Sequence, residues 1–119
     1  MSRPLRNWEE VRDFALGLPG AEEGTYYGRP AIKAATNGRA VLTESREPGN
    51  FVLHIDKERK AMLLDIDPDR FWQTQHFENW PALLVRYGED DGGVVAEWIE
   101  RALELVGARP KPRPRPNRK

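Results

Sequence analysis

Cysteine is absent from this sequence of 119 residues. Its absence excludes a disulfide framework, a thiolate zinc site, a thiol redox motif and a cysteine nucleophile. Long apolar runs are also lacking. None approaches the roughly 18 residues that cross a membrane, and none of signal-peptide length follows the N-terminus. We therefore predict a cytoplasmic protein that does not bind membranes. The length fits one domain with a core of its own.

An excess of charge of either sign is lacking too, but the balance is uneven along the chain. The sequence has 19 Lys+Arg and 19 Asp+Glu residues. Residues 109–119 hold six of the cations and no acid, which leaves 13 cations against all 19 acids in residues 1–108. A body with a net charge of −6 repels phosphate backbones. Affinity for nucleic acid is therefore expected from a local patch or from the tail.

This division predicts a single domain over residues 1–108 and a basic Pro/Arg-rich tail over residues 109–119. Prolines alternate with cations in the tail, a pattern that favours an extended, disordered polyproline II chain. Arg113 and Arg115 would attract a nucleic-acid backbone or an acidic protein surface. Two other interpretations stay open: recognition of the prolines by an aromatic groove, and a tail that only aids solubility.

Hydrophobic periodicity and turn residues predict the element order α-β-β-β-α-β-β-α. Asn7 and Glu10 form a capping-box pattern before an amphipathic helix over residues 8–18, and Asn37-Gly38 is typical of a type I′ hairpin turn. The other expected elements are strands over 31–35, 39–44, 51–55 and 82–87, a helix over 57–64, a helical turn from Asp67-Pro68, a short strand within 73–79, and a last helix capped by Asp90 or Asp91 and ended by a glycine cap at Gly107. This order predicts an α+β fold, a two-layer α/β sandwich with an antiparallel sheet.

Four segments resemble the MmcQ/YjbR family in their order and spacing. They are FALGLPGA at 14–21, GTYYGRPAIK at 24–33, FVLHID at 51–56, and FWQT at 71–74 with WPALLVR at 80–86. The resemblance covers roughly residues 7–107. It implies a YjbR-like, secretion-chaperone-like fold with helices on one face of the sheet. It also implies DNA binding by a double-wing arrangement, without a catalytic set or a cofactor. The basic tail lies outside the family pattern.

The densest cluster of candidate binding residues mixes tyrosines with cations. Cations pair with phosphates, while tyrosines stack on bases or donate hydrogen bonds. The alternative is structural, with tyrosines half-buried on the sheet and solvated cations. The candidates for contact with nucleic acid in the folded body are Tyr26, Tyr27, Arg29, Lys33 and Arg86.

Histidine is scarce, with two in the sequence. Their 22-residue separation carries no metal-ligand spacing, and Asp65, Asp67 and Asp69 lack the glycine of a calcium loop, so we predict no metal and no cofactor. His54 alternates with apolar strand residues and is expected on an open sheet face. With Tyr27 and the loop aromatics it would line a ligand pocket, whose other candidates are Trp72, His76 and Trp80. The alternative is a solvated or hydrogen-bonded histidine.

No ordered nucleophile–base pair is evident in the sequence, so we predict no enzymatic activity. The sequence favours a DNA-binding module of the MmcQ/YjbR type, a monomer or a weak homodimer. The alternative is a module that binds a small molecule or a protein in an aromatic and histidine-lined pocket.

Overall fold

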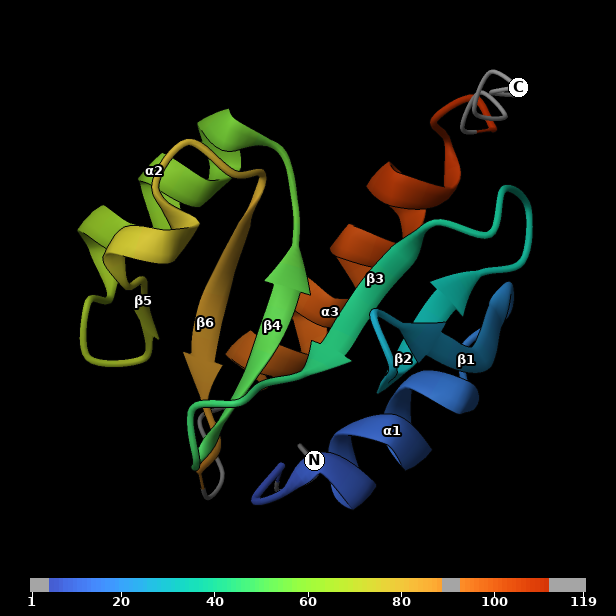
Figure 1. Cartoon of the computed structure of the whole chain (residues 1–119), viewed down its shortest axis with the longest axis horizontal. Helices are drawn as coiled ribbons and strands as arrows, with labels where there is room; N and C mark the ends of the chain where they lie inside the picture. The colour runs from blue at the N-terminus through green and yellow to red at the C-terminus, as the bar shows by residue number, and fades with distance from the viewer. Residues whose placement is uncertain (1–4, 89–92, 112–119) are drawn as a thin grey trace, which may run out of the picture.

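The computed structural model describes residues 5–88 and 93–111. In this part of the chain, six strands form one antiparallel sheet in the order β1-β2-β3-β4-β6-β5 (Figure 1). The strands are β1 Ala21–Tyr26, β2 Arg29–Ala34, β3 Ala40–Glu44, β4 Asn50–His54, β5 Phe71–Trp72 and β6 Ala82–Arg86. The helices are α1 Trp8–Leu16, α2 Lys57–Ile66, α3 Val94–Gly107 and the short 3₁₀ helix η1 Gln75–Phe77. The predicted α+β class with an antiparallel sheet is confirmed.

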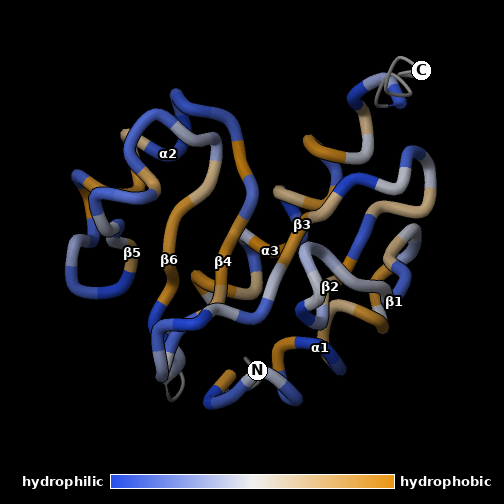
Figure 2. Tube along the Cα trace, in the orientation of Figure 1, coloured by the Kyte–Doolittle hydropathy of each residue, from blue (hydrophilic) through white to orange (hydrophobic). Residues whose placement is uncertain are grey.

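The three α-helices cover one face of the sheet. α3 packs on β2, β3 and β4, α1 packs on β1 and β2, and α2 packs at the far edge on β5 and β6. The apolar stripe of α3 consists of Val95, Ile99, Ala102 and Val106, all buried. Figure 2 shows the apolar stretches of the central strands and α3 meeting in this layer. Each large aliphatic side chain buried there adds about 1.5–3 kcal/mol to stability.

The opposite face of the sheet carries no α-helix in the described part of the chain. Successive side chains of β4 point to opposite faces of the sheet. Phe51 and Leu53 therefore pack in the core under the helices, while Val52 belongs to a separate small cluster on the other face. His54 shares the face of Val52 and is half-buried. The sequence pattern predicted this orientation. The face with Val52 and His54 is called the open face below.

The first hairpin differs from the prediction, which began the sheet at residue 31. β1 precedes the predicted strands and pairs with β2 through the two-residue turn Tyr27-Gly28. Both turn residues have positive φ, +51° and +79°, as a type I′ turn requires. The predicted type I′ turn at Asn37-Gly38 is wrong, because Asn37 is not in the left-handed region. Its buried side chain instead donates to the backbone at the end of α3.

Several element boundaries also differ from the prediction. α1 ends at Leu16 rather than at residue 18, and α2 runs on to Ile66. Asp67-Pro68 begins a single hydrogen-bonded turn, in which Arg70 and Phe71 N–H donate to Asp67 O, and this turn leads directly into β5. Residues 75–77 form η1 in place of a strand. Gly107 is the last residue of α3, not a left-handed cap. The predicted caps Asp90 and Asp91 lie outside the described residues. No helix among those described is long and apolar enough to span a membrane.

Candidate ligand pocket on the open face of the sheet

A pocket of about 570 Å³ lies on the open face, over β3 and β4. Its lining residues come from four segments that are distant in sequence: 26–29, 43–47, 52–54 and 74–80. This volume falls within the range of small-molecule sites, roughly 300–1,000 Å³. We call it the sheet-face pocket.

One side of the pocket is the tip of the β1–β2 hairpin. Tyr26 and Tyr27 meet edge to face with ring centroids 4.6 Å apart. Burial, with a smaller effect of Tyr27, raises the pKa of Tyr26, so that its hydroxyl stays protonated at neutral pH. Tyr27 is 79% exposed and holds a φ of +51°, a conformation that costs a side chain such as tyrosine about 1 kcal/mol. An aromatic ring is therefore presented to solvent at a turn position better suited to Asn or Gly. We call these two residues the hairpin wall.

The opposite side of the pocket is formed by His76, Phe77 and Trp80, in and just after η1. The ring centroid of His76 lies 5.4 Å from that of Phe77 and 5.7 Å from that of Trp80, and both distances are typical of aromatic pairs. Trp80 remains 41% exposed. We call this group the η1 wall.

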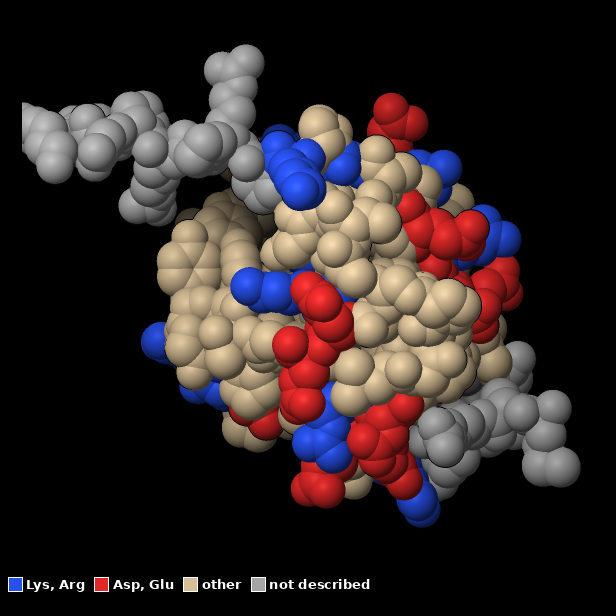
Figure 3. All heavy atoms as spheres, turned by 90° about the vertical axis from the view of Figure 1, so that its right-hand side faces the viewer, with Lys and Arg blue, Asp and Glu red and all other residues tan. Residues whose placement is uncertain are grey.

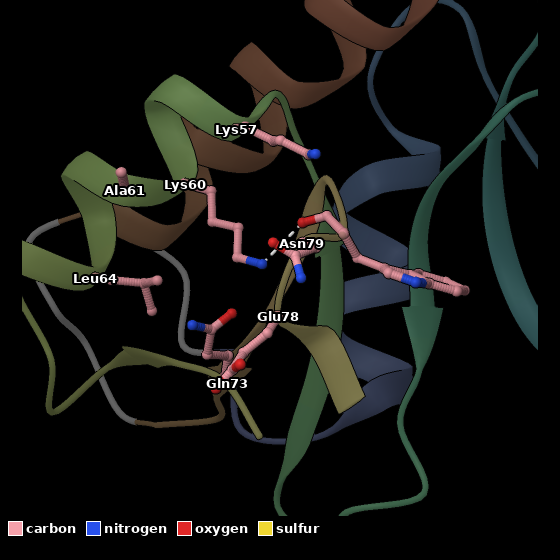
Figure 4. Close-up of a pocket in the computed structure, with 8 residues that line it drawn as sticks. Lys57, Lys60, Ala61, Leu64, Gln73, Glu78 and Asn79 are labelled. Atoms are coloured by element: carbon pink, nitrogen blue, oxygen red, sulfur yellow. Dashed lines mark hydrogen bonds between the residues drawn. The ribbon is translucent and has the colours of Figure 1, made fainter. Parts of the chain in front are cut away.

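A buried lysine holds the η1 wall in place. Lys60 of α2 is 6% exposed and donates from Nζ to the carbonyl oxygens of Phe77 at 2.6 Å and Trp80 at 2.8 Å. Figure 4 shows Lys60 reaching from α2 toward this segment, across a smaller hollow of about 330 Å³ that Lys57, Gln73 and Asn79 also line. Burial, with a smaller effect of Lys57, lowers the pKa of Lys60. Two main-chain carbonyls therefore satisfy a cation inside the protein, and the segment that carries Phe77 and Trp80 is tied to α2.

The floor of the pocket consists of Thr43, Val52 and His54. Antiparallel pairing of Thr43 with Val52 brings β3 and β4 together so that Thr43 Oγ1 lies 3.0 Å from His54 Nε2. The ring of Tyr26 stands edge to face on His54, with centroids 5.2 Å apart. Burial lowers the pKa of His54 to about 4, and the positive charge of Arg109 adds to the effect. The floor therefore presents a neutral imidazole at neutral pH.

Charged side chains stand at the rim of the pocket. Arg29 Nη1 lies 3.6 Å from Glu44 Oε1, and Arg46 and Glu47 follow in the β3–β4 connection. Acids and bases are equally represented, so the rim carries no net charge of its own. Ser45 Oγ accepts from the backbone N–H of Glu47 at 2.9 Å and thus shapes this turn.

The predicted nucleic-acid residues divide between the pocket and its surroundings. Tyr26, Tyr27 and Arg29 line the pocket. Lys33 shares their face but lies beyond the pocket, where its side chain packs over Gly24 and it pairs across the strands with Glu22. Arg113 and Arg115 lie outside the described residues.

Trp72, predicted to line the pocket, lies on the same sheet face but beside the pocket. Its indole N–H donates to Asn50 Oδ1 at 2.8 Å, and it packs against Val52. The guanidinium of Arg86 stacks on its ring at 4.6 Å. The prediction for Trp72 as a lining residue is therefore wrong, while Tyr27, His54, His76 and Trp80 are brought together as predicted.

Charges of both signs are mixed on the described surface near β1 and α1. Figure 3 shows the side of the sheet near β1 and α1, where acidic and basic side chains stand next to one another. The two sheet-face cations of β2 each face an acid, Arg29 at Glu44 and Lys33 at Glu22. Among the described residues, no three His, Cys, Asp or Glu side chains are grouped so as to hold a metal ion.

Sequence reasoning missed Thr43, Phe77 and Lys60. A signal for Lys60 was present, because it falls three residues before Leu63 on the buried face of α2. Thr43 gave no such signal, since its contact with His54 depends on the register between β3 and β4. Comparison of the chain with models of protein families, with curated proteins and with solved structures found no match. Membership of the MmcQ/YjbR family therefore stays a prediction.

Proposed function

We propose that this chain is a non-catalytic binding module, and that its ligand occupies the sheet-face pocket. The observation that supports this most directly is the convergence of the hairpin wall and the η1 wall over a polar floor, around about 570 Å³ of space. Pockets that bind small molecules are typically aromatic and apolar with a few placed polar groups, and here Thr43 and His54 are those groups. The positive φ of Tyr27 supports the same conclusion, because residues with strained backbone conformations cluster at functional sites.

The Thr43–His54 pair has the spacing of a nucleophile and its general base. Two features favour a binding role for it instead. A base works best with a pKa near the operating pH, whereas burial lowers the pKa of His54 to about 4. No carboxylate in the described part of the chain accepts a hydrogen bond from the other ring nitrogen to orient it. Ester or amide hydrolysis by the wild type that is lost in His54→Gln would contradict the non-catalytic assignment.

The test is a thermal-shift screen of the full chain against a panel of soluble metabolites. A ligand that binds only the folded state raises Tm, by several degrees once its concentration is well above Kd. We expect at least one compound to do so in the wild type and to have a smaller effect in Tyr27→Asn, which removes a pocket ring. Met62→Ala is the matched control, because Met62 is an exposed apolar residue of α2 that does not line the pocket. Equal shifts in all three proteins would overturn the proposal.

DNA binding is a second candidate, favoured by one observation. The antiparallel register places Tyr26, Arg29 and Lys33 on the open face of the sheet, and the guanidinium of Arg86 lies over Trp72 on that face. A sheet face with cations and aromatics suits contact with a nucleic-acid backbone and bases. Each cation has a neighbouring acid or ring, which weakens the attraction expected for phosphates.

Salt-dependent binding of duplex DNA tests this candidate. The full chain should be compared with a chain ending at Lys111, which keeps the bonds from Asn37 to Arg109 O and from Arg39 to Pro110 O. Binding by both, weakened in Lys33→Gln, would support a role of the fold. Binding by the full chain alone would assign the affinity to the tail, with Arg113 and Arg115. No binding by either at low salt would overturn the candidate.

A further inference from the structure

The two walls of the sheet-face pocket place aromatic residues on opposite sides of its floor. The hairpin wall supplies the phenol rings of Tyr26 and Tyr27. The η1 wall supplies the imidazole of His76, the phenyl ring of Phe77 and the indole of Trp80. Aromatic rings pair favourably with other flat rings, stacked or edge to face, at centroid distances of about 4.5–7 Å. A molecule that fills the space between these walls gains most if it is itself flat and aromatic.

The floor of the pocket selects against charge. Val52 is apolar, and His54 is a neutral imidazole because burial lowers its pKa to about 4. An ion placed on this floor loses its hydration and finds no opposite charge there. The charged groups of the pocket stand at the rim, where Arg29 and Glu44 already pair at 3.6 Å. A buried ring is therefore expected to be uncharged.

One ring nitrogen of His54 remains available to a ligand. Nε2 faces Thr43 Oγ1 at 3.0 Å, and Nδ1 has no hydrogen-bond partner among the described residues. In that part of the chain, Gln73 Oε1 is the one side-chain oxygen or nitrogen that is both enclosed and unpartnered. Nδ1 is therefore not completely enclosed. The Thr43 hydroxyl can donate to Nε2 or accept from it, so that Nδ1 offers either an N–H donor or an acceptor.

We propose that the sheet-face pocket binds a free, planar, uncharged aromatic or heteroaromatic molecule, inserted between the hairpin wall and the η1 wall with a polar atom on His54 Nδ1. The proposal rests on the proposed ligand-binding function and names the class of its ligand. The volume of about 570 Å³ and the aromatic residues on two sides favour a free molecule over a side chain presented by another protein. The ring is held by two walls whose positions depend on Tyr27 and on Lys60.

Three matched compounds test the proposal by ¹H–¹⁵N NMR titration of the full chain. They are 2-naphthamide, its saturated analogue decahydronaphthalene-2-carboxamide, and its charged analogue 2-naphthoate. The saturated analogue differs from 2-naphthamide in flatness and aromaticity, and 2-naphthoate differs from it in charge. We expect 2-naphthamide to bind at least tenfold more tightly than either analogue and to shift the indole N–H of Trp80 and the amide of Tyr27. A capped Gly-Trp-Gly peptide presents a similar ring on a peptide chain and should bind more weakly than the free ring.

Two variants connect the binding to the residues named. His54→Leu should weaken 2-naphthamide binding by about threefold to tenfold by removing Nδ1, and Tyr27→Asn should weaken it similarly by removing a ring. Tyr27 is exposed, so its variant stays informative if His54→Leu folds poorly. Met62→Ala should bind as the wild type does.

The outcomes separate this inference from the proposed function. Equal binding of the saturated or the charged analogue at the pocket would overturn the ligand class and leave the binding function standing. Tighter binding of the peptide than of the free ring would overturn the assignment to a free molecule. If none of the compounds shifts pocket residues while another metabolite does, the ligand class is wrong. If no metabolite in the screen binds either, both proposals fail.

Discussion

Lys60 Nζ lies 2.8 Å from the carbonyl oxygen of Trp80, so that a buried cation of α2 fixes a wall of a pocket on the far side of that segment. The same ammonium group donates to Phe77 O at 2.6 Å. The bonds tie the helical layer of the protein to the loop over the open face of the sheet. The pocket therefore depends on a residue that does not line it.

Replacing Lys60 should destabilise the protein and weaken ligand binding together. In Lys60→Met, the carbonyl groups of Phe77 and Trp80 lose their donor, at a cost of about 1–3 kcal/mol in the free energy of unfolding. Urea unfolding measures this loss. Lys57→Met is the control. Lys57 is a cation of the same helix, but its side chain is exposed and makes no such bonds. Similar stabilities of the two variants would contradict the assigned role of Lys60.

Two substitutions of Tyr27 should differ in their effect on stability but not in their effect on ligand binding. Asn adopts the left-handed conformation of Tyr27 readily, whereas a β-branched residue does so at higher cost. We expect Tyr27→Asn to be more stable than Tyr27→Val by about 1 kcal/mol in chemical denaturation. Both variants lack the ring and should bind pocket ligands equally weakly. If Tyr27→Val were as stable as Tyr27→Asn, the hairpin turn would not be strained at this residue.

The buried histidine should make stability depend on pH. The pKa of His54 is about 4 in the folded chain and about 6.5 in an unfolded one. As the pH falls through this window, the unfolded chain takes up a proton that the folded chain does not, so stability decreases toward acid. The wild type should lose on the order of 1–3 kcal/mol more than His54→Gln between pH 7 and pH 4. Parallel profiles of the two proteins in denaturant titrations would show that His54 does not titrate in this way.

Asn37 should be required for its side chain rather than for its backbone. Its amide donates to Val106 O at 2.7 Å and to Arg109 O at 3.0 Å, and its oxygen accepts from the backbone N–H of Arg39 at 2.9 Å. Asn37→Gly should therefore cost about 1–3 kcal/mol of unfolding free energy. In a type I′ turn the same substitution would be nearly neutral. Thermal unfolding distinguishes the two cases, and a variant as stable as the wild type would restore the turn interpretation.

Local patterns of the sequence were sufficient for most of the fold. Alternation in residues 51–55 assigned His54 to the open face, and the spacing of Val95, Ile99 and Ala102 predicted the buried stripe of α3. β1 escaped prediction because its sequence, AEEGTY, has little apolar character and its turn uses Tyr27 where Asn or Gly is typical. An atypical residue at such a turn removes the local signal that would reveal the hairpin.

The pocket required information that local patterns do not contain. His54 was predicted as a candidate because strand alternation places it on the open face, and Tyr27, His76 and Trp80 because they are aromatic or histidine residues that could line a pocket with it. Their grouping depends on strand order, which places the β1–β2 hairpin and the η1 segment on either side of β3 and β4. The separation of Trp72 from this group follows from its bond to Asn50 across the sheet. Trp72 and Asn50 are 22 positions apart, and Thr43 and His54 are 11 apart, so that no short motif indicates these contacts.

The most direct test of ligand binding in the sheet-face pocket is to locate where a stabilising ligand binds. The compound that raises Tm most in the metabolite screen should be added to ¹⁵N-labelled full chain, and the chemical-shift changes should be mapped onto the structure. We expect the largest changes at Tyr27, Thr43, His54 and Trp80, and we expect them to be smaller in Tyr27→Asn. Changes confined to the helical layer or to the tail, and unchanged in Tyr27→Asn, would contradict binding in this pocket.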